Sequence, residues 1–465
     1  MKWMTSSATA VAALTLAACA GPQPAPPAAA PANWQASLPK SGEPVAGADW
    51  WKRFDDPLLA ELIGEAQAAN PGVQQALARL AQARALAGAW GGAPQVNAAI
   101  SSQRSKPVPP AGQSLQTLNL AGLDARWEVD LFARARQQDA AQEARAEASG
   151  YDAAGVRISL AAEVAQSYLG LRACELQERI AGQDADATAK LASLSAERLR
   201  VGFEAPGNNA LLQAAASDGQ NRRLAQQAEC QVLVKQLVAL GLGDEAALRA
   251  RLAERQAKLP EPGRFALNAV PAQTLSQRPD LAAAAAQLRA AWAEAGAAQA
   301  ARYPQLTLSG SISRGELRVG GGSSEGNGWS IGPALSLPLF DGGARKSQAE
   351  AAKAGFDLAQ AGYRAAVLNA VREVEEGLVR LEANLARESH ARSSAQNYAA
   401  AFAATEQRWR SGLASVAELE EARRLALAAQ SAEVQLQRER IGAWIALYKA
   451  AGGGWNAATD AANAR

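Results

Sequence analysis

Two stretches in the second half of the chain alternate apolar with polar or small residues, as β-strands with two different faces do. In residues 306–313 and 329–339 the apolar side chains occupy every second position, and Ser, Thr, Gly and Ala fill most of the others. Successive side chains of a strand point to opposite faces, so this pattern predicts a hairpin over 304–340. A sheet packed on a soluble core would alternate in the same way, but strands of about ten residues with a polar second face also suit a membrane.

A weaker alternation predicts another hairpin over 94–131. Its first strand alternates regularly, whereas the return strand changes phase between Leu120 and Leu123. Gly122 stands at this change, and we expect a β-bulge there because glycine tolerates the irregular backbone.

Two proline-free stretches predict unusually long helices over 133–200 and 343–410. Each has 68 residues, which as one helix measures roughly 100 Å at about 1.5 Å per residue. A soluble helical bundle is the alternative, but its helices average only about 10–14 residues. In the second stretch apolar residues step by four and three positions, which is typical of a coiled-coil seam. The seam comprises Val367, Val371, Val374, Leu378, Leu381 and Leu385.

The same order of elements occurs twice, which indicates an internal duplication. Phe132 and Phe340 each close a Leu-Phe junction and stand 208 residues apart, while Gly202 and Gly412, where the long helices should reverse, stand 210 apart. Each repeat reads helix, strand pair, long helix, turn, helix. The shorter helices are expected over 57–92, 210–242, 277–302 and 415–451, with 243–274 as a belt between the repeats. The first repeat is assigned to 57–265, the second to 266–455, and a tail to 456–465.

The N-terminus has the features of an export signal. Residues 1–18 contain Lys2 and a short apolar core, and they end in "LAAC", which resembles the lipobox of bacterial lipoproteins. The resemblance implies a diacylglycerol and an N-acyl chain on Cys19. Residues 19–56 are assigned as a lipidated N-terminal tether, in which the proline-rich stretch 21–32 predicts an extended chain. No Asp follows Cys19 to match the inner-membrane retention signal, so we expect a lipid anchor in the outer membrane. An ordinary cleavage site beside a chance cysteine is the alternative.

Composition narrows the functional classes. The 47 basic and 45 acidic residues leave a net charge of +2, which gives no electrostatic reason to bind nucleic acid. One histidine, His390, and two methionines supply neither a metal site nor a histidine-based catalytic site, and no nucleophile motif appears. We therefore expect a protein that is not an enzyme and needs no cofactor.

Four strands per chain cannot close on themselves. An open sheet edge in lipid leaves backbone groups without hydrogen-bond partners, so the strands require further copies of the chain. Two copies would supply eight strands and three would supply twelve.

Several motifs in one order resemble the TolC family of outer-membrane factors, in its OprM/NodT lipoprotein branch. They are "WEVDLF" from Trp127, "RPD" from Arg278, "YPQLTLSGS" from Tyr303, "LSLPLFDGG" from Leu335 and "ALYKAAGGGW" from Ala446. The resemblance implies an α+β membrane protein: a homotrimeric 12-stranded β-barrel in the outer membrane, continued by a long α-helical coiled-coil tunnel in the periplasm. Ala133 departs from the family, which usually has Gly there.

The resemblance also implies a function. Members of the family are exit ducts of tripartite efflux pumps, which dock to a periplasmic adaptor and through it to an inner-membrane transporter, here of the RND type. A duct for type I protein secretion shares the fold, and a structural lipoprotein that spans the periplasm would need the helices but not the alternating strands.

Family members narrow the periplasmic mouth of the tunnel with acidic residues on the helix after the second turn. The matching segment "GLASVAELEEA" places Glu418 and Glu421 three residues apart on one helix face. The resemblance implies that both belong to the closed gate, whereas a solvated helix face is the alternative. It also implies contact with the adaptor at the two turns, through Arg408, Arg410, Gly412, Leu413 and Gly202.

Cys174 and Cys230 lie 28 residues on either side of Gly202. Antiparallel helices that reverse near Gly202 would bring them to similar heights, and the periplasm is oxidising. The spacing leaves two alternatives open, a disulfide or two buried free thiols.

Overall fold

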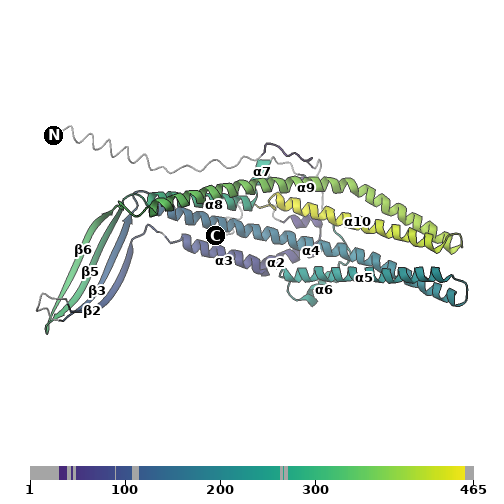
Figure 1. The fold of residues 1–465 in the computed structure, drawn as a ribbon, viewed down its shortest axis with the longest axis horizontal. Coiled ribbons are helices and arrows are strands. Elements are labelled where there is room, and N and C mark those ends of the chain that lie inside the picture. Colours follow the sequence, from purple (N-terminus) through teal and green to yellow (C-terminus); the bar gives the residue numbers. More distant parts are fainter. Residues whose placement is uncertain are drawn as a thin grey trace. The chain divides into compact units, whose positions relative to one another are not determined.

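The structure is a computed structural model, and it describes residues 31–38, 43–44, 49–89, 91–106, 115–261, 265–266 and 271–455. These residues form two compact units, whose elements Figure 1 labels. The sheet unit comprises 79–149 and 283–364, and the helical unit comprises the other described residues. The signal peptide, Cys19 and the tail 456–465 lie outside the described residues.

The sheet unit contains one antiparallel sheet built from both repeats. Its strands are β2 (Gln95–Ser105), β3 (Gln116–Val129), β5 (Gln305–Val319) and β6 (Gly322–Ser336). They lie side by side in the order β2-β3-β5-β6, so the two hairpins join through β3 and β5 (Figure 1). The outer edges of β2 and β6 have no partner strand among the described residues.

The bulge predicted at Gly122 is wrong. β3 pairs without interruption on both sides, with Gly122 opposite Ala99 on β2 and Ser313 on β5. A Cβ atom on Gly122 would lie 2.8 Å from the carbonyl oxygen of Ile312, so glycine is needed because the neighbouring backbone comes close. The change of phase instead places Leu118 and Leu120 on the face opposite Leu123.

The two long helices have equal length and contribute to both units. They are α4 (Arg134–Arg200) and α9 (Ala344–Arg410), with 67 residues each. None of the helices in the described part of the chain has a segment that is both long and apolar enough to cross a bilayer.

The helix predicted over 57–92 is broken at Asn70. It forms α2 (Pro57–Ala69) and α3 (Pro71–Ala87), because Pro71 disfavours a helical backbone at the residue before it. Asn70 has ψ 125°, and its side chain accepts a hydrogen bond from the Gly72 amide at 2.8 Å to start α3. The equivalent helix of the second repeat, α8 (Pro279–Ala300), also begins at a proline, directly after the short α7 (Pro271–Ser276).

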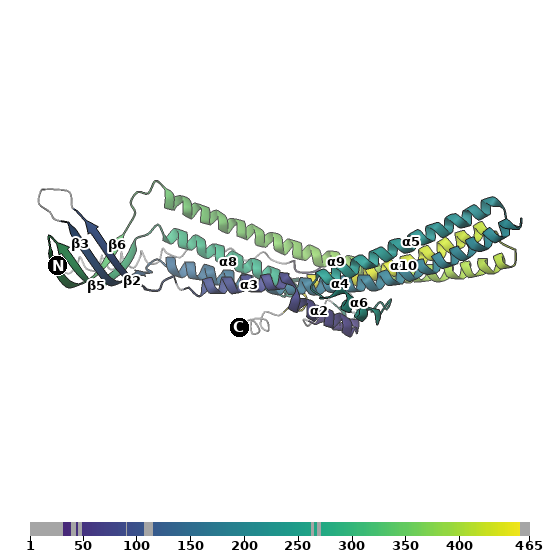
Figure 2. The ribbon, with the colours of Figure 1, turned by 90° about the horizontal axis from the view of Figure 1, so that it is seen from below.

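The helical unit is built around two antiparallel hairpins. α4 runs beside α5 (Pro206–Ala239), and α9 runs beside α10 (Val416–Ala450), as Figures 1 and 2 both show. Large apolar side chains from both hairpins and from α2 form one core. Its fully buried members include Leu59, Leu62, Ile63, Leu237, Leu378, Ile445 and Tyr448.

The described part of the segment 19–56, which the sequence assigned as a tether, packs on this core. The stretch 21–30, most of the part predicted to be extended, lies outside the described residues. A short 3-10 helix, η2 (Trp50–Phe54), buries Trp50 against Trp444 and Tyr448, with ring centroids 5.7 and 5.4 Å apart. The backbone amides of Gln35 and Ala36 both donate to the carboxylate of Glu375 on α9, at 2.7 Å each.

The segment predicted as a belt over 243–274 contains α6 (Glu245–Ala253) and the short strand β4 (Phe265–Ala266), which pairs in parallel with β1 (Glu43–Pro44) of the N-terminal segment. α6 lies against α5 and α2, because Glu245 pairs with Lys235 at 2.5 Å and Arg251 pairs with Glu65 at 2.9 Å.

Candidate functional site

One face of the sheet carries a continuous apolar band. The strand register aligns apolar side chains from all four strands in successive rows on this face, and most of them are exposed in the single chain. Trp329 and Ile331 on β6 are 78% and 70% exposed. An exposed apolar surface of this kind requires a partner or lipid. The rows are Val129, Leu306 and Leu335; Trp127, Leu308 and Pro333; Val96, Ala125, Gly310 and Ile331; and Ala98, Leu123, Ile312 and Trp329.

The opposite face is polar at the same height. Asn97 donates to the carboxylate of Asp124 at 3.2 Å, and the hydroxyls of Ser311 and Ser330 lie 2.9 Å apart. The sheet therefore has one apolar face and one polar face at this height.

Towards the hairpin tips the apolar face becomes charged. Arg314 pairs with Glu325 at 3.1 Å, and Glu316 accepts from Arg318 at 2.7 Å and from Asn119 at 3.2 Å. This polar zone bounds the apolar band on the side away from the long helices.

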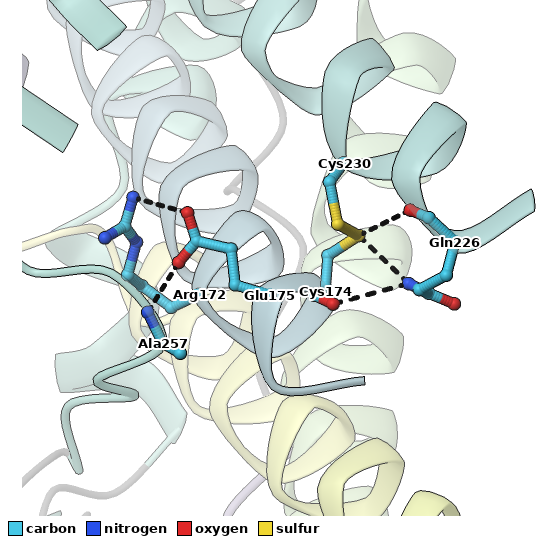
Figure 3. The surroundings of a disulfide bond; sticks show 6 residues. All are labelled: Arg172, Cys174, Glu175, Gln226, Cys230 and Ala257. Carbon is cyan, nitrogen blue, oxygen red and sulfur yellow. Dashed lines mark hydrogen bonds and ion pairs between the residues drawn. A yellow bond between two sulfur atoms is a disulfide. The ribbon is translucent and has the colours of Figure 1, made fainter. Parts of the chain in front are cut away.

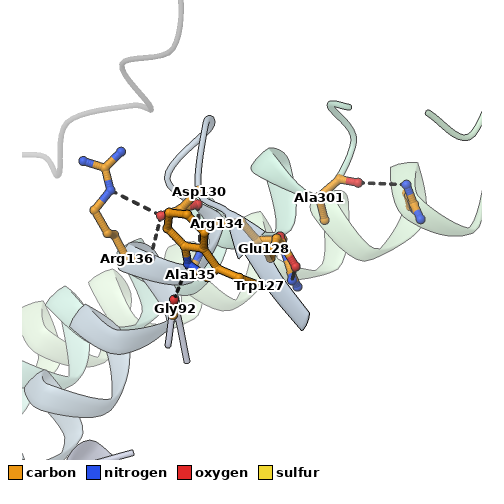
Figure 4. Close-up of polar contacts among 9 residues, drawn as sticks. Gly92, Trp127, Glu128, Asp130, Arg134, Ala135, Arg136 and Ala301 are labelled. Carbon is orange, nitrogen blue, oxygen red and sulfur yellow. Dashed lines mark hydrogen bonds and ion pairs between the residues drawn. The ribbon is translucent and has the colours of Figure 1, made fainter. Parts of the chain in front are cut away.

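The first junction from strand to long helix is held by carboxylates (Figure 4). Asp130 accepts from the backbone amides of Ala135 and Arg136, which begin α4, at 3.2 and 3.0 Å. Glu128 at the end of β3 pairs with Arg134 at 2.5 Å, and the Trp127 indole donates to the Gly92 carbonyl at 3.0 Å.

The second junction repeats this arrangement with different residues. Asp341 accepts from the amides of Gly343 and Arg345 at 3.0 and 3.3 Å, and the Arg345 guanidinium donates to the Ala301 carbonyl at 3.1 Å. The residue before each long helix has a left-handed backbone, with φ +61° at Ala133 and +87° at Gly343. A left-handed backbone at this position explains why the family usually has glycine there. Ala133 adopts the same conformation at a steric cost, because its Cβ atom is crowded by the backbone.

The two turns of the helical unit are the same Schellman motif. At the first, the amides of Gly202 and Phe203 donate to the carbonyls of Leu199 and Arg198, at 3.0 and 2.8 Å. At the second, Gly412 and Leu413 donate to Trp409 and Arg408, at 2.9 and 2.7 Å. Both glycines have the positive φ that this motif requires, +80° and +75°.

Each turn presents an apolar side chain to solvent. Leu413 is 70% exposed and Phe203 is 77% exposed. We did not predict Phe203 from the sequence, although alignment of "RLRVGF" with "RWRSGL" places it opposite Leu413 and would have found it.

Two predicted adaptor residues make contacts within the second turn. The Arg408 guanidinium donates to the Leu413 carbonyl at 3.2 Å, and Arg410 pairs with Glu406 one helical turn away at 2.9 Å. Arg408 therefore supports the turn, while most of the Arg410 side chain remains exposed.

Glu418 and Glu421 both lie on the first turns of α10 and have different partners. Ser415 and Glu418 form a capping box, in which Glu418 accepts from the Ser415 amide at 2.7 Å. This hydrogen bond lowers the pKa of Glu418 below its ordinary value. Glu421 accepts from Arg424 at 2.7 and 3.0 Å, which likewise lowers the pKa of Glu421. Both groups are therefore carboxylates at neutral pH.

Cys174 of α4 and Cys230 of α5 form a disulfide in the structure, with their Cα atoms 5.6 Å apart (Figure 3). Of the two alternatives that the spacing left open, the structure has this one. The Gln226 side chain lies over the bond and donates to the sulfur of Cys174 at 3.0 Å. Both cysteines are buried, so the bond connects the two helices inside the unit.

A buried arginine lies on α4 beside this disulfide (Figure 3). Arg172 is fully buried, pairs with Glu175 at 3.1 Å and donates to the Leu252 carbonyl at 2.9 Å. Glu175 in turn accepts from the Ala257 amide at 2.7 Å, so α4 is connected to the segment after α6. Within the described residues, no three His, Cys, Asp or Glu side chains gather as a metal site would.

Comparison with known proteins agrees with these features. The Outer membrane efflux protein family profile matches the chain twice, over residues 62–240 and 270–453, which correspond to the two repeats. The pyoverdine export outer membrane protein OpmQ of Pseudomonas aeruginosa is 31% identical over 466 residues, covering 96% of each chain. Nodulation protein T of Rhizobium leguminosarum bv. viciae is 28% identical over 435 residues, covering 91% of this chain and 88% of that one.

A solved structure has the same fold. The outer-membrane channel OprN superposes with a TM-score of 0.86 at 30% identity, covering 94% of this chain and 99% of the channel. The predicted resemblance is thereby confirmed: the chain belongs to the outer membrane efflux protein family, the TolC-type channels of the outer membrane.

Proposed function

We propose that three copies of the chain form a closed 12-stranded barrel in the outer membrane, continued by a helical tunnel, and that this trimer is the exit duct of an efflux pump. The sheet carries the proposal, because it has an apolar face, a polar face and two edges without a partner strand in the described part of the chain. Backbone groups at an edge strand need partners in hydrocarbon, and pairing β2 of one copy with β6 of the next would supply them. The exposed apolar band then faces lipid and the polar face lines the pore.

The cargo is proposed to be small molecules, delivered through a periplasmic adaptor from an RND-type transporter in the inner membrane. The names of relatives support this class, since one is a pyoverdine export protein and another belongs to a toluene efflux pump. These names describe the relatives, and the range of cargo for this chain requires its own measurement.

Glu418 and Glu421 are proposed to form acidic rings at the periplasmic end of the duct. Three copies around an axis would bring six carboxylates together, which attracts cations and disfavours close approach unless the charge is screened. Glu418→Gln removes the charge but keeps a side chain that can accept from the Ser415 amide, so it separates the gate from the helix cap. We expect Glu418→Gln and Glu421→Gln to lower the cation selectivity of single-channel currents. Glu406→Gln, on α9 near the turn, is the control and should leave them unchanged. Single-channel currents that are unchanged in both ring variants would remove the gate assignment.

The two turns are proposed to contact the adaptor. Gly202 and Gly412 shape them, Arg408 and Arg410 flank the second, and the exposed Leu413 and Phe203 offer apolar surface. Leu413→Ser should reduce resistance in cells without reducing trimer yield or conductance. Loss of conductance together with resistance would point to a damaged channel instead.

Cys19 is proposed to carry the lipid anchor. Acyl chains at the N-terminus would hold the chain at the membrane in addition to the barrel. Mass spectrometry of the mature N-terminal peptide tests this, and an unmodified Cys19 would contradict it.

The proposed function is tested by purification, bilayer recording and gene deletion together. We expect a trimer in detergent, discrete ion-conducting events in a planar bilayer, and greater susceptibility to drugs and dyes in the deletion strain, restored by the intact gene. A monomer without conductance would contradict the duct.

A further inference from the structure

A cavity of about 570 Å³ opens in the helical unit where α4, α9 and α10 meet. Arg380 and Arg387 of α9 and Arg438 of α10 line it, together with Glu439. Leu169 of α4 and Ile441 and Ile445 of α10, all buried, supply its apolar wall. A cavity of this size is typical of small-molecule sites.

The arginines of this cavity are poorly compensated. Arg387 lies 3.3 Å from the carboxylate of Glu439, whereas Arg380 reaches only Glu376, at 3.8 Å and outside hydrogen-bond distance. Glu376 is already paired with Arg372 at 2.8 Å. Arg438 makes no ion pair or hydrogen bond with the residues that the structure describes. Three guanidinium groups thus share one lining carboxylate, which leaves an excess of about two positive charges.

A buried amide adds a donor to the same cavity. Asn384 is only 7% exposed and lines the cavity between Arg380 and Arg387 along α9. Its Oδ1 accepts from Arg387 at 3.4 Å, while its side-chain nitrogen donates to no group in the described ranges. This nitrogen is therefore available to donate to an anion bound in the cavity.

A second cavity in the same unit shows that unpaired arginines are not general here. The larger groove of about 840 Å³ between α4, α5 and α10 also has three arginines. There Arg222 pairs with Asp184 at 2.6 Å, Arg423 with Glu420 at 2.9 Å and Arg424 with Glu421 at 2.7 Å. Of these two cavities in the helical unit, only the smaller one has a positive excess.

We propose that the smaller cavity binds a small amphiphilic anion. A carboxylate, phosphate or sulfonate group would lie among Arg380, Arg387 and Arg438 and accept a hydrogen bond from Asn384. The apolar part of the molecule would lie against Leu169, Ile441 and Ile445. Guanidinium groups and a neutral amide suit this ligand because charge-assisted hydrogen bonds are strong and the apolar wall adds burial. The inference concerns binding only and does not depend on the export function.

The test uses 4-iodobenzoate as the probe, with the full-length, oxidised protein in a neutral detergent. Calorimetry should show one site per chain, with affinity falling as salt rises. The uncharged analogue 4-iodobenzamide should bind at least about tenfold more weakly than 4-iodobenzoate. The same weakening is expected for inorganic phosphate, which lacks the apolar body. Anomalous scattering from iodine in a soaked crystal should locate the probe beside Asn384.

Two variants distinguish the arginines of this cavity from paired arginines elsewhere in the helical unit. Arg438→Gln removes an exposed side chain and should weaken benzoate binding about tenfold without changing the circular dichroism of the helices. Arg424→Gln, in the paired groove, is the matched control and should leave binding unchanged. The inference is overturned if benzoate does not bind, if benzamide or phosphate binds equally well, or if Arg438→Gln has no effect. It is also overturned if Arg438→Gln abolishes binding by dissociating the trimer, since the arginines would then serve contacts between copies.

Discussion

The two repeats share one topology but stabilise their helical hairpins differently. The first connects α4 to α5 by the buried disulfide Cys174–Cys230, and the N-cap residue of α5, Ala205, makes no side-chain capping hydrogen bond. The second has no cross-link between the described parts of α9 and α10, but its turn is closed by the Ser415 capping box. Ion pairs such as Arg440–Glu388, at 3.1 Å, connect its two helices. Ion pairs such as Arg222–Asp184, at 2.6 Å, also connect the helices of the first hairpin. The covalent bond is therefore what distinguishes the first hairpin from the second.

The largest expected effect comes from removing the covalent bond. Cys174→Ser with Cys230→Ser opens a loop with a sequence separation of 56 residues, and we expect a loss of roughly 4 kcal/mol in unfolding free energy. Thermal unfolding followed by circular dichroism of the helices measures it. Reductant should lower the wild-type transition to that of the variant and leave the variant unchanged. If the wild type and the variant unfold at the same temperature, the disulfide does not stabilise the first hairpin, and the proposed difference between the repeats is contradicted.

The turn glycines should behave alike in the two repeats. Gly202→Ala and Gly412→Ala each place a side chain in the left-handed region, at a cost of about 1–2 kcal/mol, although neither Cβ meets an atom within 4 Å. Gly355→Ala in the interior of α9, where the space is also open, should instead stabilise by about 1 kcal/mol. Unequal losses at the two turns would show that the two Schellman motifs are not equivalent.

At the junctions between strand and long helix, a substitution is expected to stabilise the first repeat and to destabilise the second. Ala133→Gly should raise the unfolding free energy by about 1 kcal/mol, because glycine adopts φ +61° without the clash of a Cβ atom. Gly343→Ala should lower it by a similar amount at the equivalent position. A destabilised Ala133→Gly protein would contradict the strain assigned to this residue.

The smallest effect concerns the capping box of the second turn. The amide of Ser415 lowers the pKa of Glu418, so this contribution to stability is present above the unfolded pKa and is lost as pH falls through the folded pKa. Ser415→Ala, which removes the serine half of the box, should cost up to about 1 kcal/mol at neutral pH. The unfolding free energy of the wild type and of Ser415→Ala, measured across the acidic range, checks this. If Glu418→Gln had the same pH profile of stability as the wild type, the role of the carboxylate would be contradicted.

The regular elements could be predicted because their signals are local. Alternation along 306–313 and 329–336 and the absence of proline over 134–200 depend on neighbouring residues alone, and both agree with the observed strands and helix. The strands are longer than the alternating stretches, since β5 reaches Val319 and β6 begins at Gly322. The break at Asn70 was also local, since Pro71 marks it, but the helical periodicity on both sides obscured it.

The packed N-terminal segment could not be predicted in this way. Its position depends on Glu375 and Trp444, more than 300 residues away, and a proline-rich composition carries no information about them. The same reason applies to Gly122. Glycine is required there because the backbone of β5 lies close to it, and the sequence of β3 alone does not show this. Phe203 became recognisable only when the two turns were compared.

The most direct test of the account is a spin-label scan along β6. Single cysteines replace Trp329, Ser330, Ile331, Gly332 and Leu335 in the protein reconstituted in lipid. The collision rates of each attached label with oxygen and with a water-soluble nickel reagent are then measured. We predict a period of two, with oxygen favoured at 329, 331 and 335 and nickel favoured at 330 and 332. Equal access at all five positions would contradict a sheet that separates lipid from a water-filled pore.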